Sequence, residues 1–196
     1  CNCFMNFELI YNNFFIIITG LDETLKLVII SLGLGFFISI PFALARVSSI
    51  KALSKGVYCY VFIIRGTPLL VQIYLIYYGL GTIEYVRESF LWIILKDPFY
   101  CGVLALVLNT VAYTTEIFRG GIQSITKGQI ESCKSLGMGA VAMYLKIVLP
   151  CAFRQALPGY GNEMILMVKS TSLVSLITVM EMTGLAKNIM YKTLLL

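Results

Sequence analysis

A run of nineteen residues without a charged side chain, from Leu27 to Ala45, constrains this chain more than any other feature. An α-helix rises 1.5 Å per residue, so about 20 apolar residues are needed to cross a hydrocarbon core of roughly 30 Å. Two glycines and Pro41 interrupt the run, and such residues are ordinary in membrane helices. The run therefore predicts a membrane span.

The composition agrees with a membrane protein. The 196 residues are 59% hydrophobic and 13% charged, with a mean hydropathy of +0.87, whereas soluble domains are about 25% charged. We therefore predict an all-α, polytopic membrane protein that forms one domain over residues 1–196.

Other apolar runs predict further spans. A second span is expected from near Tyr58 to Ile83, with Arg65 close to its cytoplasmic end, and a third from Phe99 to Thr115. The apolar stretch from Phe14 to Ile18 either extends the first span or lies at the interface. A fourth run, from Ala156 to Met180, is interrupted by charged residues.

The charges between these spans predict an orientation. Basic residues dominate the loop after the first span and the segment from Arg119 to Arg154, whereas the loop from Gly81 to Pro98 has three acids and two basic residues. Cytoplasmic loops of membrane proteins carry an excess of Lys and Arg. The N-terminus is therefore expected outside.

Composition also excludes several kinds of site. The chain has no histidine, which excludes imidazole acid–base chemistry and histidine metal sites. The six cysteines have no CxxC spacing, so we expect no metal or redox role. Basic residues form no stripe typical of a nucleic-acid interface, and no nucleic-acid partner is expected.

A cytoplasmic helix is predicted after the third span. Thr126 and Gln129 have the spacing of a capping box, in which each side chain binds the other residue's backbone N–H. Apolar residues then recur at three- and four-residue intervals, which is typical of an amphipathic helix. These residues are Ile130, Cys133, Leu136 and Ala140.

This loop resembles a signature of one transporter family. It reads Glu131-Ser-Cys-Lys-Ser-Leu-Gly137, then nine residues, then Ile147-Val-Leu-Pro150. The pattern is similar to the EAA motif of binding-protein-dependent ABC permeases, with Ser132 and Cys133 in place of the usual alanines. Segments that begin at Arg65, Leu108 and Leu157 extend the resemblance to the polar amino-acid uptake branch of type I importers.

The resemblance implies a type I importer permease fold of about four to five transmembrane helices, with the last helix of the family missing after Leu194. It implies a permease without a cofactor or metal site of its own, because ATP is bound and hydrolysed by a partner. The implied partners are an ABC ATPase dimer, a second permease in a homo- or heterodimer, an extracytoplasmic solute-binding protein and an amino-acid substrate. The implied location is the bacterial cytoplasmic (inner) membrane.

The resemblance also assigns a coupling role to the loop at residues 119–150. A rigid helix in this loop would dock on the ATPase, and Gly137 would permit a turn or a close backbone approach. The residues expected to couple are Gln129, Glu131, Ser132, Cys133, Leu136 and Gly137.

Polar residues in the fourth apolar run are candidates for the solute path, because charged side chains in a membrane are costly and usually functional. Residues seven apart on a helix share a stripe, so polar groups would line one face. We expect Lys169 to meet the carboxylate of an amino acid and Glu163 its cationic group. Alternatively, Lys169 snorkels to the outer interface and Glu163 pairs with it or with Arg154. The full set is Asn162, Glu163, Lys169, Ser170, Thr171 and Ser172.

Two other charged motifs are interpreted as structural. Glu116 and Arg119 are three residues apart and are expected to form a helix-end ion pair. The segment Arg65-Gly-Thr-Pro68 is interpreted as a span entry and helix start, not as a solute contact.

Other functions remain as alternatives: an ABC permease for another small polar solute, a multi-pass membrane enzyme, or a passive channel. The chain lacks a phosphate-binding GxxxxGK[ST] motif and an evident catalytic set. A channel would not need the capped cytoplasmic helix. The leading hypothesis is thus a transport subunit and not an enzyme.

Overall fold

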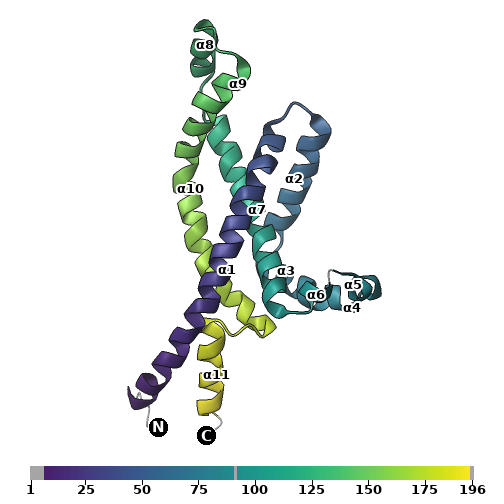
Figure 1. Cartoon of the computed structure of the whole chain (residues 1–196), viewed down its shortest axis with the longest axis vertical. Coiled ribbons are helices and arrows are strands. Elements are labelled where there is room, and N and C mark those ends of the chain that lie inside the picture. The colour runs from purple at the N-terminus through teal and green to yellow at the C-terminus, as the bar shows by residue number, and fades with distance from the viewer. Residues whose placement is uncertain (1–6, 91, 195–196) are drawn as a thin grey trace. The chain divides into compact units, whose positions relative to one another are not determined.

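The structure, a computed structural model, describes residues 7–90 and 92–194. These residues form helices joined by short turns, and they contain no strand (Figure 1). η1 and η2 are π-helical turns, and η3 is a 3₁₀-helix. The elements are α1 (Phe7–Val47), α2 (Lys51–Gly66), α3 (Leu69–Tyr74), η1 (Leu75–Gly79), α4 (Leu80–Thr82), α5 (Glu84–Glu88), α6 (Trp92–Leu95), α7 (Pro98–Gln123), α8 (Lys127–Ser135), α9 (Ala140–Met143), η2 (Tyr144–Val148), α10 (Leu149–Ser170), η3 (Thr171–Ile177) and α11 (Met182–Leu194).

Three helical segments are long and apolar enough to cross a membrane: 13–47 in α1, α7, and the continuous stretch 140–177. A fourth span is obtained if α2 and the following helix, which are separated by a break, are counted together. The predicted all-α polytopic fold is confirmed, with a number of spans at or below the lower end of the predicted range.

The first span is longer than its uncharged run. α1 continues without interruption from Phe7 to Val47, so the apolar stretch before Leu21 belongs to the same helix as the first span. Charged residues near Asp22 do not end the helix, because ion pairs of Lys26 with Asp22 and Glu23 join side chains three and four residues apart.

The predicted second span from near Tyr58 to Ile83 is not one continuous helix but a pair of helices bent by 102° at a break. α2 begins at Lys51 and ends at Gly66, and a new helix begins at Leu69. Thr67 is extended (φ −111°, ψ 141°), because the ring of the following proline disfavours helical geometry in the residue before it. Arg65 therefore lies at the far end of α2 from Lys51, about 21 Å along the helix axis at 1.5 Å per residue.

The fourth apolar run also changes geometry. α10 ends at Ser170, and the chain continues as the tighter helix η3 from Thr171 to Ile177. Thr178 then takes a left-handed conformation (φ 70°) and stops the helix. The predicted stripe along α10 therefore does not continue with the same period to Thr171 and Ser172.

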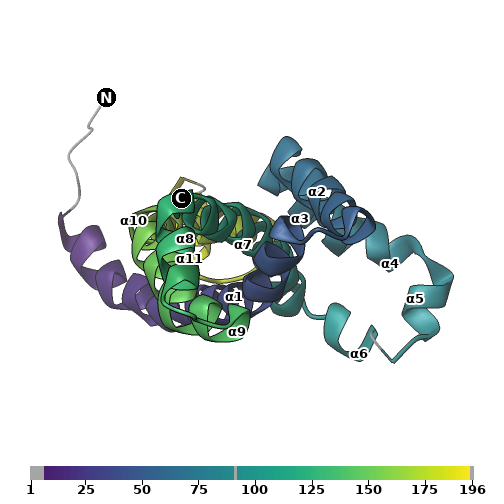
Figure 2. The same cartoon turned by 90° about the horizontal axis from the view of Figure 1, so that it is seen from above.

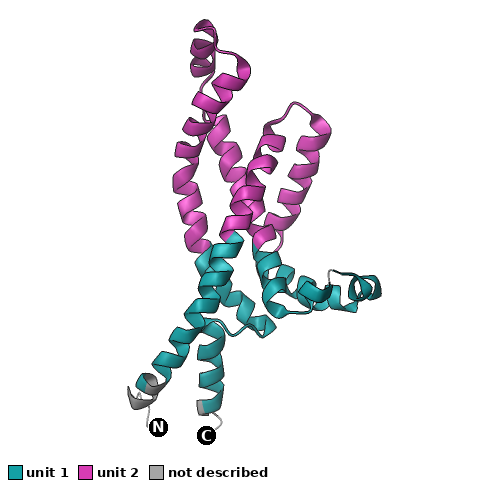
Figure 3. Ribbon diagram, viewed as in Figure 1, with its two compact units in different colours: residues 1–31, 69–106, 167–196 teal, residues 32–68, 107–166 magenta. Residues whose placement is uncertain are grey.

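The chain folds into two compact units, each assembled from segments that are distant in the sequence (Figure 3). Unit 1 takes the described parts of residues 1–31, 69–106 and 167–196, and unit 2 takes residues 32–68 and 107–166. The helices α1, α7 and α10 each contribute residues to both units.

Unit 2 is built around close helix contacts. The second half of α1 and α2 lie side by side (Figure 1), and the hydroxyl of Ser54 donates to the carbonyl of Arg46 at 2.9 Å. The phenol of Tyr60 donates to the Leu108 carbonyl on α7 at 2.7 Å. At Gly121, an added Cβ would lie 2.5 Å from the Ala152 carbonyl, so only glycine permits this approach of α7 and α10.

Unit 1 holds α11 against the first part of α1. The backbone N–H of Met182 donates to the Thr24 hydroxyl at 3.3 Å. The buried carboxylate of Glu181 caps α11 by accepting the N–H groups of Thr183 and Gly184 at 2.9 and 3.0 Å. In both views, α4, α5 and α6 project from α3, away from α11 (Figures 1 and 2).

Candidate solute path and coupling loop

The predicted capping box is present at the start of α8. The N–H of Gln129 donates to the Thr126 hydroxyl at 3.4 Å, and the N–H of Thr126 donates to the Gln129 side-chain oxygen at 3.1 Å. Two backbone donors that an isolated helix end leaves unpaired are thus satisfied. The expected helix start at residue 126 is confirmed.

Gly137 ends the same helix in a left-handed conformation (φ 74°). The N–H of Met138 donates to the Cys133 carbonyl at 3.1 Å, and the N–H of Gly137 donates to the Lys134 carbonyl at 2.9 Å. This pair of bonds is a Schellman motif. A Cβ added at Gly137 would meet nothing within 4 Å, so within this chain the glycine serves the turn and not a close approach.

The inner side of the loop packs into a small apolar core. Cys133, Met143 and Val148 are buried together, with Ile130 packed against them. Leu136 and Ala140 do not continue this buried stripe, because α8 ends at Ser135 and the helical period is lost there. The apolar stripe that makes this segment amphipathic is therefore limited to α8 itself.

The outer side of the loop is open. Glu131 and Ser132 are exposed, and Leu136 is 80% exposed. Two large apolar residues that we had not selected, Val141 and Leu145, are also exposed. An apolar side chain in a loop predicted to be cytoplasmic is the signal that would have identified them.

In unit 2, Asn162 and Glu163 of α10 do not lie on one common face, contrary to our prediction. Asn162 is exposed, whereas Glu163 is 5% exposed, because consecutive helical residues point about 100° apart. Among the described residues, no basic side chain forms an ion pair with Glu163.

In unit 1, the other candidate residues surround the junction of α10 and η3. Lys169 is exposed, Ser170 is half-buried and Thr171 is buried. The Thr171 hydroxyl donates to the Val168 carbonyl at 2.8 Å, and the Ser172 hydroxyl donates to the Lys169 carbonyl at 2.7 Å. Both hydroxyl oxygens thus retain lone pairs with which to accept a hydrogen bond.

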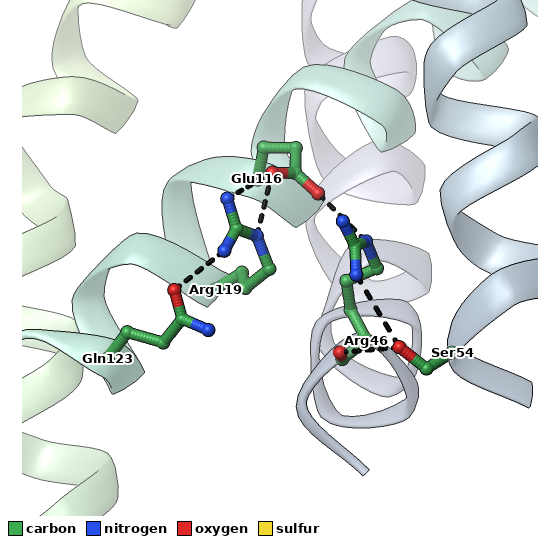
Figure 4. Close-up of polar contacts among 5 residues, drawn as sticks. All are labelled: Arg46, Ser54, Glu116, Arg119 and Gln123. Atoms are coloured by element: carbon green, nitrogen blue, oxygen red, sulfur yellow. Dashed lines mark hydrogen bonds and ion pairs between the residues drawn. The ribbon is translucent and has the colours of Figure 1, made fainter. Parts of the chain in front are cut away.

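A charge network in unit 2 includes the predicted ion pair (Figure 4). Arg119 contacts one carboxylate oxygen of Glu116 through Nε and Nη2, at 2.7 and 2.6 Å, which confirms the pair. Arg46 Nε lies 3.2 Å from the other oxygen of the same carboxylate. Arg46 also stands over the Tyr58 ring, 4.8 Å from its centroid, so the network connects α1, α2 and α7.

Comparison with known proteins identifies the family. The model of the family described as "Binding-protein-dependent transport system inner membrane component" matches residues 31–194. The chain belongs to this family. Its members are transport components of ABC importers and not enzymes, and they operate with an ATPase and a solute-binding protein.

Relatives of this permease subunit transport amino acids and opines. It is 50% identical over 190 residues to the nopaline transport system permease protein NocM of Agrobacterium fabrum, covering 96% of this chain and 79% of the relative. It is 43% identical over 172 residues to the histidine/lysine/arginine/ornithine transport system permease protein HisM of Escherichia coli, covering 87% and 72%. The relatives of this permease subunit are thus amino-acid and opine ABC permeases.

A solved structure supports the fold of the permease subunit. The crystal structure of an amino acid ABC transporter with histidines matches with a TM-score of 0.85 and 36% identity. The match covers 96% of this chain and 84% of that chain. The helical arrangement described above is therefore that of an amino-acid ABC permease.

Proposed function

We propose that this permease subunit carries a cationic amino acid, or a conjugate of one, across the bacterial cytoplasmic membrane. It works with a second permease, two ATPase subunits and an extracytoplasmic solute-binding protein. ATP is bound and hydrolysed by the ATPase subunits, and the permease itself needs no cofactor.

The buried carboxylate of Glu163 is the observation that favours a cationic solute. An acidic side chain inside a membrane protein is costly unless it meets an opposite charge, and no ion-pair partner of Glu163 is found in the described part of the chain. The four solutes in the name of HisM all carry a nitrogen base in the side chain. A solute of this kind would supply the missing positive charge.

The rest of the path is proposed along α10 and the start of η3. Asn162 and Lys169 are exposed, and hydroxyls follow at the junction of the two helices. Lone pairs on these hydroxyls suit the ammonium group of an amino acid. The residues proposed to line this part are Asn162, Lys169, Ser170, Thr171 and Ser172.

The loop that contains α8 is proposed to couple ATP hydrolysis by the ATPase subunits to movement of the solute. Both ends of α8 are capped, and Cys133 anchors its inner side. Five of the six predicted coupling residues remain exposed for a partner: Gln129, Glu131, Ser132, Leu136 and Gly137. A capped and anchored helix can transmit a displacement of its outer side to α10 without unravelling.

Uptake by the reconstituted complex tests this function. The assembled complex in proteoliposomes, with its binding protein outside and ATP inside, should accumulate labelled L-arginine and not labelled L-glutamate. Glu163→Gln, which keeps the size of the side chain, should lower arginine uptake at least tenfold, the effect of about 1.4 kcal/mol. Glu88→Gln, the same change at an exposed position of α5, is the control.

ATP dependence distinguishes the importer from a passive channel. Omission of ATP should abolish accumulation. Arginine uptake by Glu163→Gln at the parent rate would exclude Glu163 from the path.

A further inference from the structure

We propose that Arg65 binds the carboxylate of the solute, in a pocket between α2 and α7 of unit 2. This inference rests on the proposed function, and it adds a specificity-determining residue to the solute path. It departs from our sequence-based interpretation of the Arg65-Gly-Thr-Pro68 segment as a helix start without a solute contact.

The position of Arg65 in α2 is the first argument. Since α2 begins at Lys51, Arg65 lies about 21 Å along the helix from the basic loop. At this depth a charged side chain is costly in a membrane, and such residues face a cavity or a partner. A role as a positive anchor at the cytoplasmic interface is therefore unsuited to Arg65, whereas Lys51 is placed for that role.

The pocket itself is the second argument. It has a volume of about 350 Å³, which lies within the range of small-ligand sites. The Arg65 guanidinium lies over the Tyr113 ring, 4.8 Å from the centroid, so the ring holds the cation in place without neutralising it. The lining includes Tyr58, Phe62, Arg65, Tyr113 and Glu116.

The charge balance of this pocket favours an anionic group. Glu116 is the acidic residue of the lining, but its two oxygens already contact Arg119 and Arg46. Arg65 has no ion pair with any acidic side chain in the part of the chain that the structure describes. A planar guanidinium with free donors matches a carboxylate in two parallel hydrogen bonds.

The register of the helices relates this pocket to Glu163. α7 and α10 are in contact at Ile117 and Gly159, where an added Cβ on the glycine would lie 3.2 Å from the Ile117 side chain. The two helices are antiparallel (Figure 1), so one further turn along α10 and one turn back along α7 bring Glu163 level with Tyr113. An amino acid at this level would meet a cation for its carboxylate and a carboxylate for its basic group.

A comparison of two probes tests the inference. L-arginine and agmatine share the guanidinium, but agmatine lacks the carboxylate. Binding of each is measured directly on the purified complex in nanodiscs, without the binding protein, so that selection by that protein does not contribute. The parent complex should bind L-arginine about ten- to hundredfold more tightly than agmatine, the range for one charged hydrogen-bonded contact.

Variants locate the contact that recognises the carboxylate. Arg65→Gln should lower the affinity for L-arginine to that for agmatine and leave agmatine binding unchanged. Arg65→Lys should keep part of the preference, because an ammonium replaces the charge but not the fork of donors. Lys55→Gln, at an exposed position of the same helix, is the matched control and should keep the full preference.

Several results would overturn the proposal. Equal affinities of the parent for both probes would do so without any variant, even if Arg65→Gln does not assemble. The proposal would also be overturned if Arg65→Gln kept the preference for L-arginine over agmatine. Loss of this preference in Lys169→Gln and not in Arg65→Gln would have the same meaning. If Glu163→Gln abolishes arginine uptake and Arg65→Gln keeps the preference, this inference alone fails; if Glu163→Gln transports normally, the proposed function fails.

Discussion

Arg46 Nε on α1 lies 3.2 Å from Glu116 Oε1 on α7, and Arg119 contacts the other oxygen of the same carboxylate. The side chains of Arg46 and Glu116 are only 17% and 14% exposed. One carboxylate thus compensates two poorly solvated guanidinium groups. Removal of the acid leaves both cations without their partner, whereas removal of one arginine leaves a complete pair.

We therefore predict different costs for the members of this network. Glu116→Gln should destabilise the folded state by about 3 kcal/mol, the lower end of the cost of breaking a buried pair. Arg119→Gln should cost less, because Arg46 still pairs with the acid. The measurement is the thermal unfolding midpoint of the purified complex in detergent.

A control for this prediction lies in α1. Asp22 pairs with Lys26 on the surface of the helix, with side chains 70% and 49% exposed, so Asp22→Asn should change the midpoint little. Equal shifts for Glu116→Gln and Asp22→Asn would mean that burial of the network adds nothing to its strength.

Two glycines of the coupling loop should respond differently to the same substitution. An added Cβ meets nothing within 4 Å at either Gly128 or Gly137, but only Gly137 has a positive φ. Gly137→Ala should therefore destabilise the end of α8 by about 1 kcal/mol. Gly128→Ala should stabilise the helix by roughly 0.5–1 kcal/mol, since alanine loses less backbone entropy there.

Amide hydrogen exchange over residues 127–138 measures this difference. Exchange should be faster in Gly137→Ala and slower in Gly128→Ala. The bulkier Gly137→Val should also lower the amount of solute imported per ATP hydrolysed. Parent-like exchange and coupling in all three variants would contradict a role for the Schellman turn.

The exposed side of the loop should bind the ATPase through Leu136. Leu136→Ser removes an apolar side chain that is 80% exposed, and interface anchors of this kind contribute about 2 kcal/mol, or roughly thirtyfold in affinity. The amount of ATPase that copurifies with the permease should fall accordingly. Ile50→Ser, at an exposed position of the first basic loop, should leave it unchanged, and equal losses would argue for a nonspecific effect.

The distribution of basic residues predicts which loops face the cytoplasm. In a background with the native cysteines replaced by alanine, cysteines at Ser49 and Ser124 should be protected from an impermeant thiol reagent in intact cells. A cysteine at Glu88 should react. All three native residues are exposed, so burial would not account for protection, and the reverse labelling pattern would invert the topology.

Short-range features of this protein were predictable from the sequence because they depend on residues close together in the chain. Thr126 and Gln129 are three residues apart, and a helix start needs only that spacing for both hydrogen bonds. The Glu116–Arg119 pair follows from one helical turn. The uncharged run in α1 predicts a span by its length and composition alone.

Helix ends were predicted less well, because the absence of charge is an imperfect guide to them. α2 starts at Lys51, six residues before its apolar part begins at Val57, since basic residues are compatible with a helix outside the hydrocarbon core. Pro68 is a local signal for the helix break, because a proline disfavours helical geometry in the residue before it. The uncharged run across Pro68 nevertheless led us to predict one continuous span.

The sequence by itself determined that this is a helical membrane protein with a capped loop helix, because hydropathy and capping act over a few neighbouring residues. Only the tertiary structure decided that Glu116 serves Arg46 and Arg119, and that Arg65 lies over Tyr113. These contacts join residues on different helices, and they depend on how closely the helices approach at positions such as Gly35 and Gly121. No spacing along the chain specifies that approach; it follows from which small side chains the packed helices bring together.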